Sequence, residues 1–299
     1  IVRLAAAYAG EGVDDANYDM EFLETAKKKL NELYLLIKDN YGKGRTDTNA
    51  IDRWFESKIN TAIKNTTEAL ESMLFKSAVQ YSLMDMIRHL KTYLKRTNSK
   101  PNKRLINLFS ESLIKMLTPV TPHFCEEVWE AIGGKGFISA QSWPEYEEEK
   151  IDKEAEAVEE LAHSTLSDFE TVLKLAQIEK PKEVVLVAAP TWKYELVRIL
   201  KEELEKTRDQ RALINTCLAE KDIKPHGQEV VKIVQMVLKD SGKLPEILID
   251  KEKELEAYES VKGLIKEDYK VAVVIETAEK SKEQKAKQAM PGKPAIIIK

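Results

Sequence analysis

Residues 49–73 read NAIDRWFESKINTAIKNTTEALESM and carry the pattern that decides the fold of the first half of the chain. Apolar side chains recur every three or four positions, which places them on one face of an α-helix. Asn49 is predicted to cap this helix, and Asp52 puts a carboxylate in the first turn, where the helix dipole favours negative charge. The buried face is predicted to consist of Ile59, Ala62, Ile63, Thr66, Leu70 and Met73. A helix with one such face needs partners.

Three further amphipathic segments supply those partners. They run over residues 22–37, 77–97 and 105–117 and are separated by short polar or glycine-containing turns. Four helices joined by short loops pack as a bundle. A shorter helix is predicted from Pro122, at a favoured first helical position, to Ile132, where Gly133-Gly134 ends it. The predicted fold of residues 1–150 is an α-helical bundle.

The remaining residues, 151–299, are predicted to form a small α/β domain. Short apolar runs at 183–189, 270–275 and 295–298, and a weaker one at 247–249, suggest strands separated by helices. The boundary between the domains is placed near Lys150, inside a run from 145 to 160 that holds nine acids against two lysines. A run of this kind is typical of a solvated helix face near a domain boundary.

Composition excludes several classes of protein. Hydrophobic residues make up 43% and charged ones 33%, and no apolar run approaches the ~18 residues of a membrane span. Two cysteines, 125 and 217, are too few for a disulfide scaffold. The four histidines lack the spacing of a zinc site. These features favour a helix-rich cytoplasmic protein, and a net charge of −4 means that any nucleic acid must be bound by a local basic surface.

No catalytic motif is found in this chain. The only glycine cluster, residues 133–136, lacks the phosphate-loop pattern and does not follow a strand. Ser112 and Lys115 form an SxxK pair inside a predicted helix, without the companion motifs that such enzymes carry. The sequence therefore predicts no catalytic residue, no metal site and no cofactor bound by this chain.

Two basic segments are candidates for phosphate contact. The first holds seven positive charges, with no acid between positions 86 and 110: Arg88, Lys91, Lys95, Arg96, Lys100, Lys103 and Arg104. The second, residues 280–299, holds six lysines and one acid and includes Lys285 and Lys287. Both match the electrostatic pattern expected for nucleic-acid binding. The alternative for each is a solvated helix end or loop with no ligand.

Specific stretches carry a family resemblance. Residues 117–144, LTPVTPHFCEEVWEAIGGKGFISAQSWP, resemble the end of the helical anticodon-binding domain of class I aminoacyl-tRNA synthetases for leucine, isoleucine and valine. Residues 52–54 (DRW), with INTAIKNTTEALE, resemble its start. Residues 221–239 and the ending KQAMPGKPAIIIK are similar to the C-terminal domain of archaeal and eukaryotic leucyl-tRNA synthetases. Residues 4–19, LAAAYAGEGVDDANYD, resemble the segment that follows the catalytic KMSKS loop in that family.

The resemblance implies a function that the residues alone do not. The parent enzyme would join leucine to tRNA(Leu) with ATP and magnesium. This chain would be its C-terminal part, without the catalytic and editing domains, and inactive by itself. The bundle would grip the tRNA, and the C-terminal domain would contact the long variable arm. Alternatives are the equivalent part of an isoleucine or valine enzyme, and a helical scaffold that binds proteins.

Base contacts are expected from the tail if the resemblance holds. Gln288 offers an amide, and the main chain of residues 295–299, including Ile298 and Lys299, offers hydrogen bonds to exposed bases. Relatives often end in an acid, whereas this chain ends in Lys299. The resemblance therefore implies no role for that terminal side chain.

Overall fold

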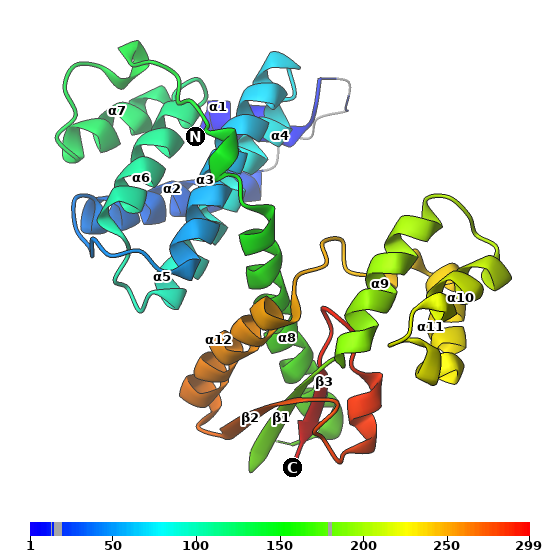
Figure 1. Cartoon of the computed structure of the whole chain (residues 1–299). Helices are drawn as coiled ribbons and strands as arrows, with labels where there is room; N and C mark the ends of the chain where they lie inside the picture. Colours follow the sequence, from blue (N-terminus) through cyan, green and yellow to red (C-terminus); the bar gives the residue numbers. More distant parts are fainter. Residues whose placement is uncertain (13, 15–19, 179–180) are drawn as a thin grey trace. The chain divides into compact units, whose positions relative to one another are not determined.

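The computed structural model describes residues 1–12, 14, 20–178 and 181–299, which form two compact units, residues 1–156 and 157–299 (Figure 1). Unit 1 is helical, and unit 2 combines helices with a three-stranded sheet, so the predicted fold class is confirmed. Part of the opening segment that carries the resemblance, residues 13 and 15–19, lies outside the described residues. No helix in the described ranges is long and apolar enough to cross a bilayer.

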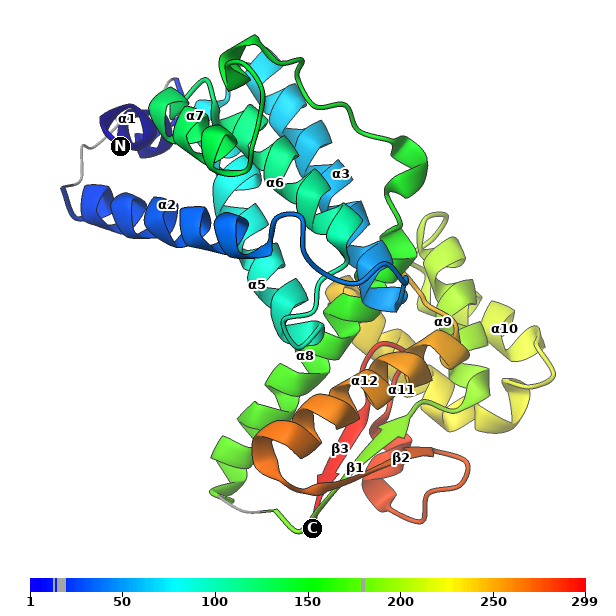
Figure 2. The same ribbon diagram turned by 90° about the vertical axis from the view of Figure 1, so that its left-hand side faces the viewer.

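Unit 1 is organised around the long central helix α3 (Ala50–Glu71; Figure 2). Its helices are α1 (Val2–Ala9), α2 (Met20–Asn40), α3, α4 (Phe75–Val79), the π-helical segment η1 (Gln80–Asp85), α5 (Met86–Arg96), α6 (Lys103–Leu117) and α7 (Pro122–Ala131). Helix α3 contacts α4, η1, α5 and α6. In the core, the Phe55 ring stacks on Tyr93 with ring centroids 4.0 Å apart, and Phe109 lies 5.6 Å from Phe55. Burial of these aromatic side chains stabilises the bundle.

The helix predicted over residues 77–97 is not uniform. Its middle, η1, is π-helical, between α4 and α5. A π-helical segment bonds each N–H to a carbonyl five residues back instead of four, so it shifts which side chains face the core. A pattern read at 3.6 residues per turn does not detect this change.

The acidic run at 145–160 is irregular in its first half and helical in its second half. Residues 145–147 and 151–152 have no regular structure, η3 (Glu148–Lys150) is a short 3-10 turn, and α8 (Lys153–Ala176) begins in the middle of the run. Glu156 accepts a hydrogen bond from the Ser57 hydroxyl at 2.6 Å and pairs with Lys58 at 3.0 Å. Burial raises the pKa of Glu156, but these bonds outweigh it and the net pKa is lowered. The sequence could not identify these partners, which come from α3, almost a hundred positions away.

Trp143 packs on the helical core. Its indole N–H donates to the Thr67 hydroxyl at 2.9 Å. The turn before it includes η2 (Ile138–Ala140), whose first amide bonds the Glu126 carboxylate at 2.8 Å.

Unit 2 holds the rest of α8 and the sheet. Its remaining elements are β1 (Glu183–Ala188), α9 (Thr191–Leu204), α10 (Gln210–Ala219), η4 (Lys224–His226), α11 (Gly227–Lys239), η5 (Ser241–Lys243), α12 (Lys251–Tyr269), β2 (Ala272–Thr277), η6 (Gln284–Gln288) and β3 (Ala295–Ile298). The strand order is β2-β1-β3, with β2 parallel and β3 antiparallel to β1. The central strand β1 is covered on both faces, which explains its continuous apolar sequence.

The weak strand prediction at 247–249 is wrong. Ile249 is buried and Ile247 packs on the same core, but the segment is irregular and leads into α12. A short apolar run indicates burial without specifying a strand, because periodicity cannot separate the two in so few residues.

Candidate nucleic-acid interface

Helix α5 presents the first predicted cations on one exposed face. Arg88 and Lys91 lie three residues apart, and both side chains are exposed. Each nevertheless has an acidic neighbour: Arg88 lies 3.0 Å from Asp85, and Lys91 lies 2.8 Å from Glu32 of α2. Such exposed pairs contribute little stability, so phosphates can replace the acids at low cost. Glu32 is far from Lys91 along the chain, so no local sequence pattern indicates this pair.

The last turn of α5 and the loop after it extend this surface. Lys95, Lys100 and Lys103 are exposed, and Arg96 is partly exposed. Lys95 and Arg96 stand where the negative end of the helix dipole favours cations. Lys100 and Lys103 form no ion pair with any described residue.

Arg104 has a more specific environment. It pairs with Glu56 of α3 at 2.9 Å, and its side chain remains 61% exposed. The hydrogen bond to Glu56 raises the pKa of Arg104 against the effect of partial burial. The basic surface, defined as Arg88, Lys91, Lys95, Arg96, Lys100, Lys103 and Arg104, therefore continues from α5 through the loop into α6.

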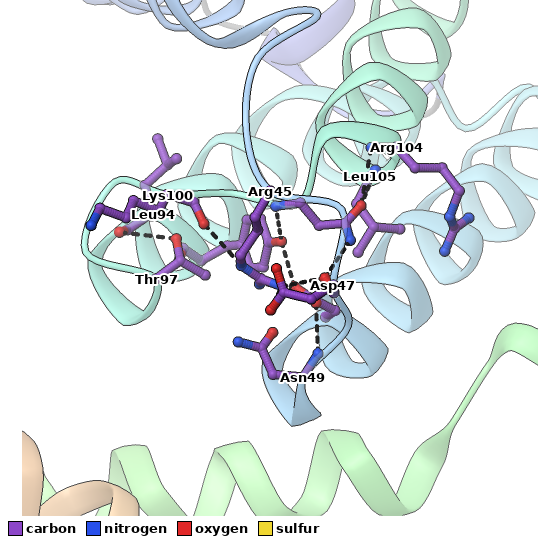
Figure 3. A network of polar contacts seen from close by, with 11 residues as sticks. Arg45, Asp47, Asn49, Leu94, Thr97, Lys100, Arg104 and Leu105 are labelled. Atoms are coloured by element: carbon purple, nitrogen blue, oxygen red, sulfur yellow. Dashed lines mark hydrogen bonds and ion pairs between the residues drawn. The ribbon is translucent and has the colours of Figure 1, made fainter.

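A buried network lies behind this loop, and Figure 3 shows the part of it around Arg45. The Arg45 guanidinium donates to Asp52 at 2.8 Å, and the Tyr93 hydroxyl donates to the same carboxylate at 2.6 Å. The amide of Asn49 adds a third donor at 2.9 Å, and Asp52 is 1% exposed. Burial raises the pKa of Asp52, but the bonds from Arg45 and Tyr93 outweigh it and the net pKa is lowered.

Asp52 is therefore more than the dipole-stabilising acid predicted from its place in the first turn. Its three donors come from the loop before α3, from the cap residue and from α5. Asn49 occupies the N-cap position as predicted and forms a capping box with Asp52, whose carboxylate accepts the Asn49 backbone amide. Sequence reasoning recognised the position of the acid and missed its partners.

Backbone bonds fix the basic loop against the segment that carries Arg45 (Figure 3). The Arg45 amide donates to the Pro101 carbonyl, and the Lys103 amide donates to the Arg45 carbonyl, both at 2.9 Å. Gly44 has φ +121°, and a Cβ there would lie 2.2 Å from the Pro101 oxygen, so only glycine fits. The Asn102 side chain caps α6 through the amides of the next turn. Lys100 and Lys103 thus extend from a backbone held in one conformation.

The second candidate surface lies on the tail of unit 2. Lys285, Lys287 and Gln288 are exposed on η6. Lys299 is also exposed, but its ammonium lies 3.2 Å from Glu283 and 3.4 Å from Glu183. Ion pairing with Glu283 raises the pKa of Lys299.

Most of the terminal main chain already has partners, contrary to the expectation that all of it could meet a ligand. Lys299 exchanges backbone hydrogen bonds with Glu183 in both directions, at 2.9 and 3.2 Å. Hydrogen-bonded and non-bonded pairs alternate along an antiparallel ladder, so the N–H and C=O groups of Ile296 and Ile298 point away from β1. Because β3 is an edge strand, these groups are the ones left for a ligand. Ile298 stays a candidate on this ground.

The described residues contain no group of three or more His, Cys, Asp or Glu side chains that could hold a metal ion. Both cysteines are buried, and burial raises the pKa of each thiol to about 11, so neither is a reactive thiolate at neutral pH. The candidate residues therefore offer cations and amide groups at the surface, which suit binding to phosphate groups.

The family described as "Anticodon-binding domain of tRNA ligase" matches residues 52–233, which is more than half of the chain. The chain belongs to this family of tRNA-ligase anticodon-binding domains.

Archaeal relatives make the assignment more specific. The leucine–tRNA ligase of Pyrococcus horikoshii is 31% identical over 100% of this chain and 30% of its own length. That of Aeropyrum pernix is 33% identical over 97% of this chain and 30% of its own length. The resemblance to archaeal leucyl-tRNA synthetases is confirmed, and the chain spans about 30% of the length of these relatives.

A solved structure is also similar. It is a ternary complex of LeuRS from Agrobacterium radiobacter K84 with tRNA and LeuAMS. The match has a TM-score of 0.43 and 16% sequence identity, and it covers 63% of this chain and 21% of that chain.

Proposed function

We propose that this chain binds tRNA(Leu) as part of a leucine–tRNA ligase. The observation that carries the proposal is the rigid basic loop: Lys100 and Lys103 extend from a backbone locked to Arg45, in a chain of the anticodon-binding family. A fixed row of cations next to α5 suits folded RNA, which proteins bind largely through the shape of its phosphate backbone. The net charge of −4 restricts such binding to local surfaces of this kind.

The two units would bind different parts of the tRNA. Unit 1 would contact the tRNA backbone. The tail of unit 2 would contact the long variable arm through Lys285, Lys287, Gln288 and the backbone N–H and C=O groups of Ile298 that point away from β1. The whole cytoplasmic ligase would join leucine to tRNA with ATP and magnesium, in catalytic and editing domains that these residues do not form. The chain alone would then be inactive in both reactions.

Salt dependence tests the tRNA-binding proposal directly. If about five cations of unit 1 contact phosphates, log K should fall with log salt at a slope of about −4, taking ~0.7–0.9 per contact. The measurement is a titration of tRNA onto the full chain between 50 and 300 mM salt, about the range where counterion release dominates. A salt-independent affinity for tRNA would contradict the proposal, and salt-tolerant binding of a protein instead would favour the helical scaffold.

The tail has its own prediction. The triple variant Lys285→Gln, Lys287→Gln and Gln288→Ala should lower the affinity for long-arm leucine tRNA by at least ~10-fold, about 1.4 kcal/mol. The affinity for short-arm tRNAs should stay nearly unchanged. Point variants are needed because a deletion from 288 onward would also remove β3 from the sheet. The measurement compares the affinities of both tRNA classes at one salt concentration.

Lys280→Gln with Lys282→Gln provides the matched control, since these exposed lysines lie in the same tail outside η6. These two substitutions should lower the affinity for both tRNA classes slightly and to the same extent. If the η6 variant also weakens both classes equally, the tail is a phosphate clamp without a recognition role, because phosphate contacts carry no sequence information.

A further inference from the structure

Among the Asp, Glu, Lys and Arg side chains of the described residues, three are almost fully buried: Asp52, Lys193 and Glu254, none more than 2% exposed. Burying a charge is costly unless strong hydrogen bonds compensate, so each of them needs a structural reason. Asp52 lies behind the basic loop of unit 1. The other two belong to unit 2, and both bond to the backbone of the tail.

Lys193 reaches the tail from the first turn of α9. Its ammonium donates to the carbonyls of Lys287 and Ala289, at 2.6 and 2.9 Å, and lies 3.8 Å from Glu229. Burial lowers the pKa of Lys193, and Glu229 opposes the shift. The Lys287 carbonyl precedes Gln288 and the Ala289 carbonyl follows one residue after it, so one buried ammonium holds the backbone at both ends of the Gln288-Ala289 pair while the Gln288 side chain stays exposed.

Glu254 reaches the next part of the tail from α12. Its carboxylate accepts the Gly292 amide at 2.8 Å and the hydroxyl of Tyr258. Gly292 sits in a tight turn closed by two backbone bonds between Met290 and Lys293, at 3.0 and 2.8 Å. Its φ of +76° requires glycine, and a Cβ there would lie 3.3 Å from Pro245. The Met290-Pro291-Gly292 sequence therefore makes a turn fastened to a buried acid.

We propose that Lys193 and Glu254 are positioning residues that hold residues 285–293 in one conformation and so present Lys285, Lys287 and Gln288 to RNA. This inference rests on the tRNA-binding role proposed above. The charges act through the backbone and do not touch the ligand. Because the segment is ordered before binding, the ordering entropy is not lost in the complex, and the benefit appears as affinity for the long arm.

Hydrogen exchange in the full chain without RNA tests the positioning itself. In the wild type, the amides of Ala289, Gly292 and Lys293 should exchange at least ~100-fold more slowly than in a free peptide. Lys193→Met should speed exchange at Ala289 and its neighbours by ~10-fold or more, while β1 and α12 keep their protection. Lys193→Arg, which retains donors, should restore part of the protection.

Lys201→Met is the matched control. Lys201 also lies on α9 and also donates to two backbone carbonyls, those of Pro245 and Glu246. It should leave exchange at Lys287, Gln288 and Ala289 unchanged. Wild-type tail amides that exchange as fast as a free peptide would overturn the proposal without any variant, even if Lys193→Met does not fold. Unchanged exchange in a folded Lys193→Met would overturn it as well.

RNA binding separates this inference from the function on which it rests. In the wild-type background, Lys193→Met should lower the affinity for long-arm leucine tRNA by ~10-fold. It should have no further effect once Lys285, Lys287 and Gln288 are replaced as described above. Additive losses would mean that Lys193 acts elsewhere. If the triple replacement alone changes nothing, the tail's role in recognition fails, while the exchange experiment still decides whether Lys193 holds the segment.

Discussion

Replacing Arg45 with methionine is expected to lower the free energy of unfolding of unit 1 by about 3–5 kcal/mol, the range for removing one partner of a buried ion pair. The loss leaves the Asp52 carboxylate, 1% exposed, with only the Tyr93 hydroxyl and the Asn49 amide as donors. Denaturant unfolding followed by tryptophan fluorescence measures it. A Trp192→Phe background confines the signal to unit 1, because the other three tryptophans lie there.

Arg104→Met is the matched control for this prediction. It removes an arginine–carboxylate pair of the same unit whose arginine is largely exposed, so it should cost no more than about 1 kcal/mol. The double variant Arg45→Met/Asp52→Asn should recover part of the loss, since it no longer buries an unpaired charge. Equal losses for Arg45→Met and Arg104→Met would show that the buried network does not stabilise the bundle.

The same pair predicts a pH dependence. The folded-state pKa of Asp52 is lowered, so its contribution to stability is full above the unfolded-state pKa of ~3.9 and is lost as pH falls through the folded-state pKa. The stability difference between the wild type and Arg45→Met should therefore narrow as the pH drops below about 4. A difference that stays constant down to the acid transition would contradict this account.

Reversing three charges on α5 is expected to have the largest effect on RNA binding. Arg88→Glu, Lys91→Glu and Lys95→Glu together should flatten the slope of log K against log salt by about 2–3 and weaken all tRNAs similarly. The acids near Arg88 and Lys91 do not change this expectation, because exposed pairs contribute little and can be exchanged for phosphates. The measurement is the salt titration described above, on protein shown to be folded.

A control with the same charge change uses Lys27→Glu, Lys28→Glu and Lys135→Glu. These exposed lysines lie on α2 and after α7, outside the basic surface. They should lower affinity through net charge alone and leave the slope almost unchanged. If the α5 variant behaves like this control, the exposed face of α5 is a solvated surface. Lys100→Gln with Lys103→Gln would then show whether the loop alone contacts phosphates.

Local pattern was sufficient to predict most of the secondary structure. The apolar spacing of residues 49–73 predicted α3, except that Met73 lies beyond the helix and is exposed, and the continuous apolar run at 183–189 predicted β1. Both signals depend on which residues lie within a few positions of each other, and this is the range over which helix and strand periodicity acts. The same range explains the misses: the π-helical η1 changes the period, and 247–249 is too short to separate strand from irregular core.

The candidate cations were also identifiable from the sequence, because charge and exposure follow from composition and helix position. Their actual surroundings were not. Glu32 beside Lys91 and Glu183 beside Lys299 come from distant parts of the chain, and no local pattern connects them.

Local sequence patterns specified most of the helices and strands and the two basic segments, and the motifs indicated the family. Tertiary structure alone decided which of those cations stand on a fixed backbone. Asp52, Lys193 and Glu254 look like ordinary surface charges in the sequence, yet folding buries Asp52 against Tyr93 of α5, and Lys193 and Glu254 against the tail. Whether a charged side chain stays exposed or becomes buried depends on how separate segments pack in the folded protein. The free-energy cost of burial is set by desolvation, which no short stretch of sequence encodes.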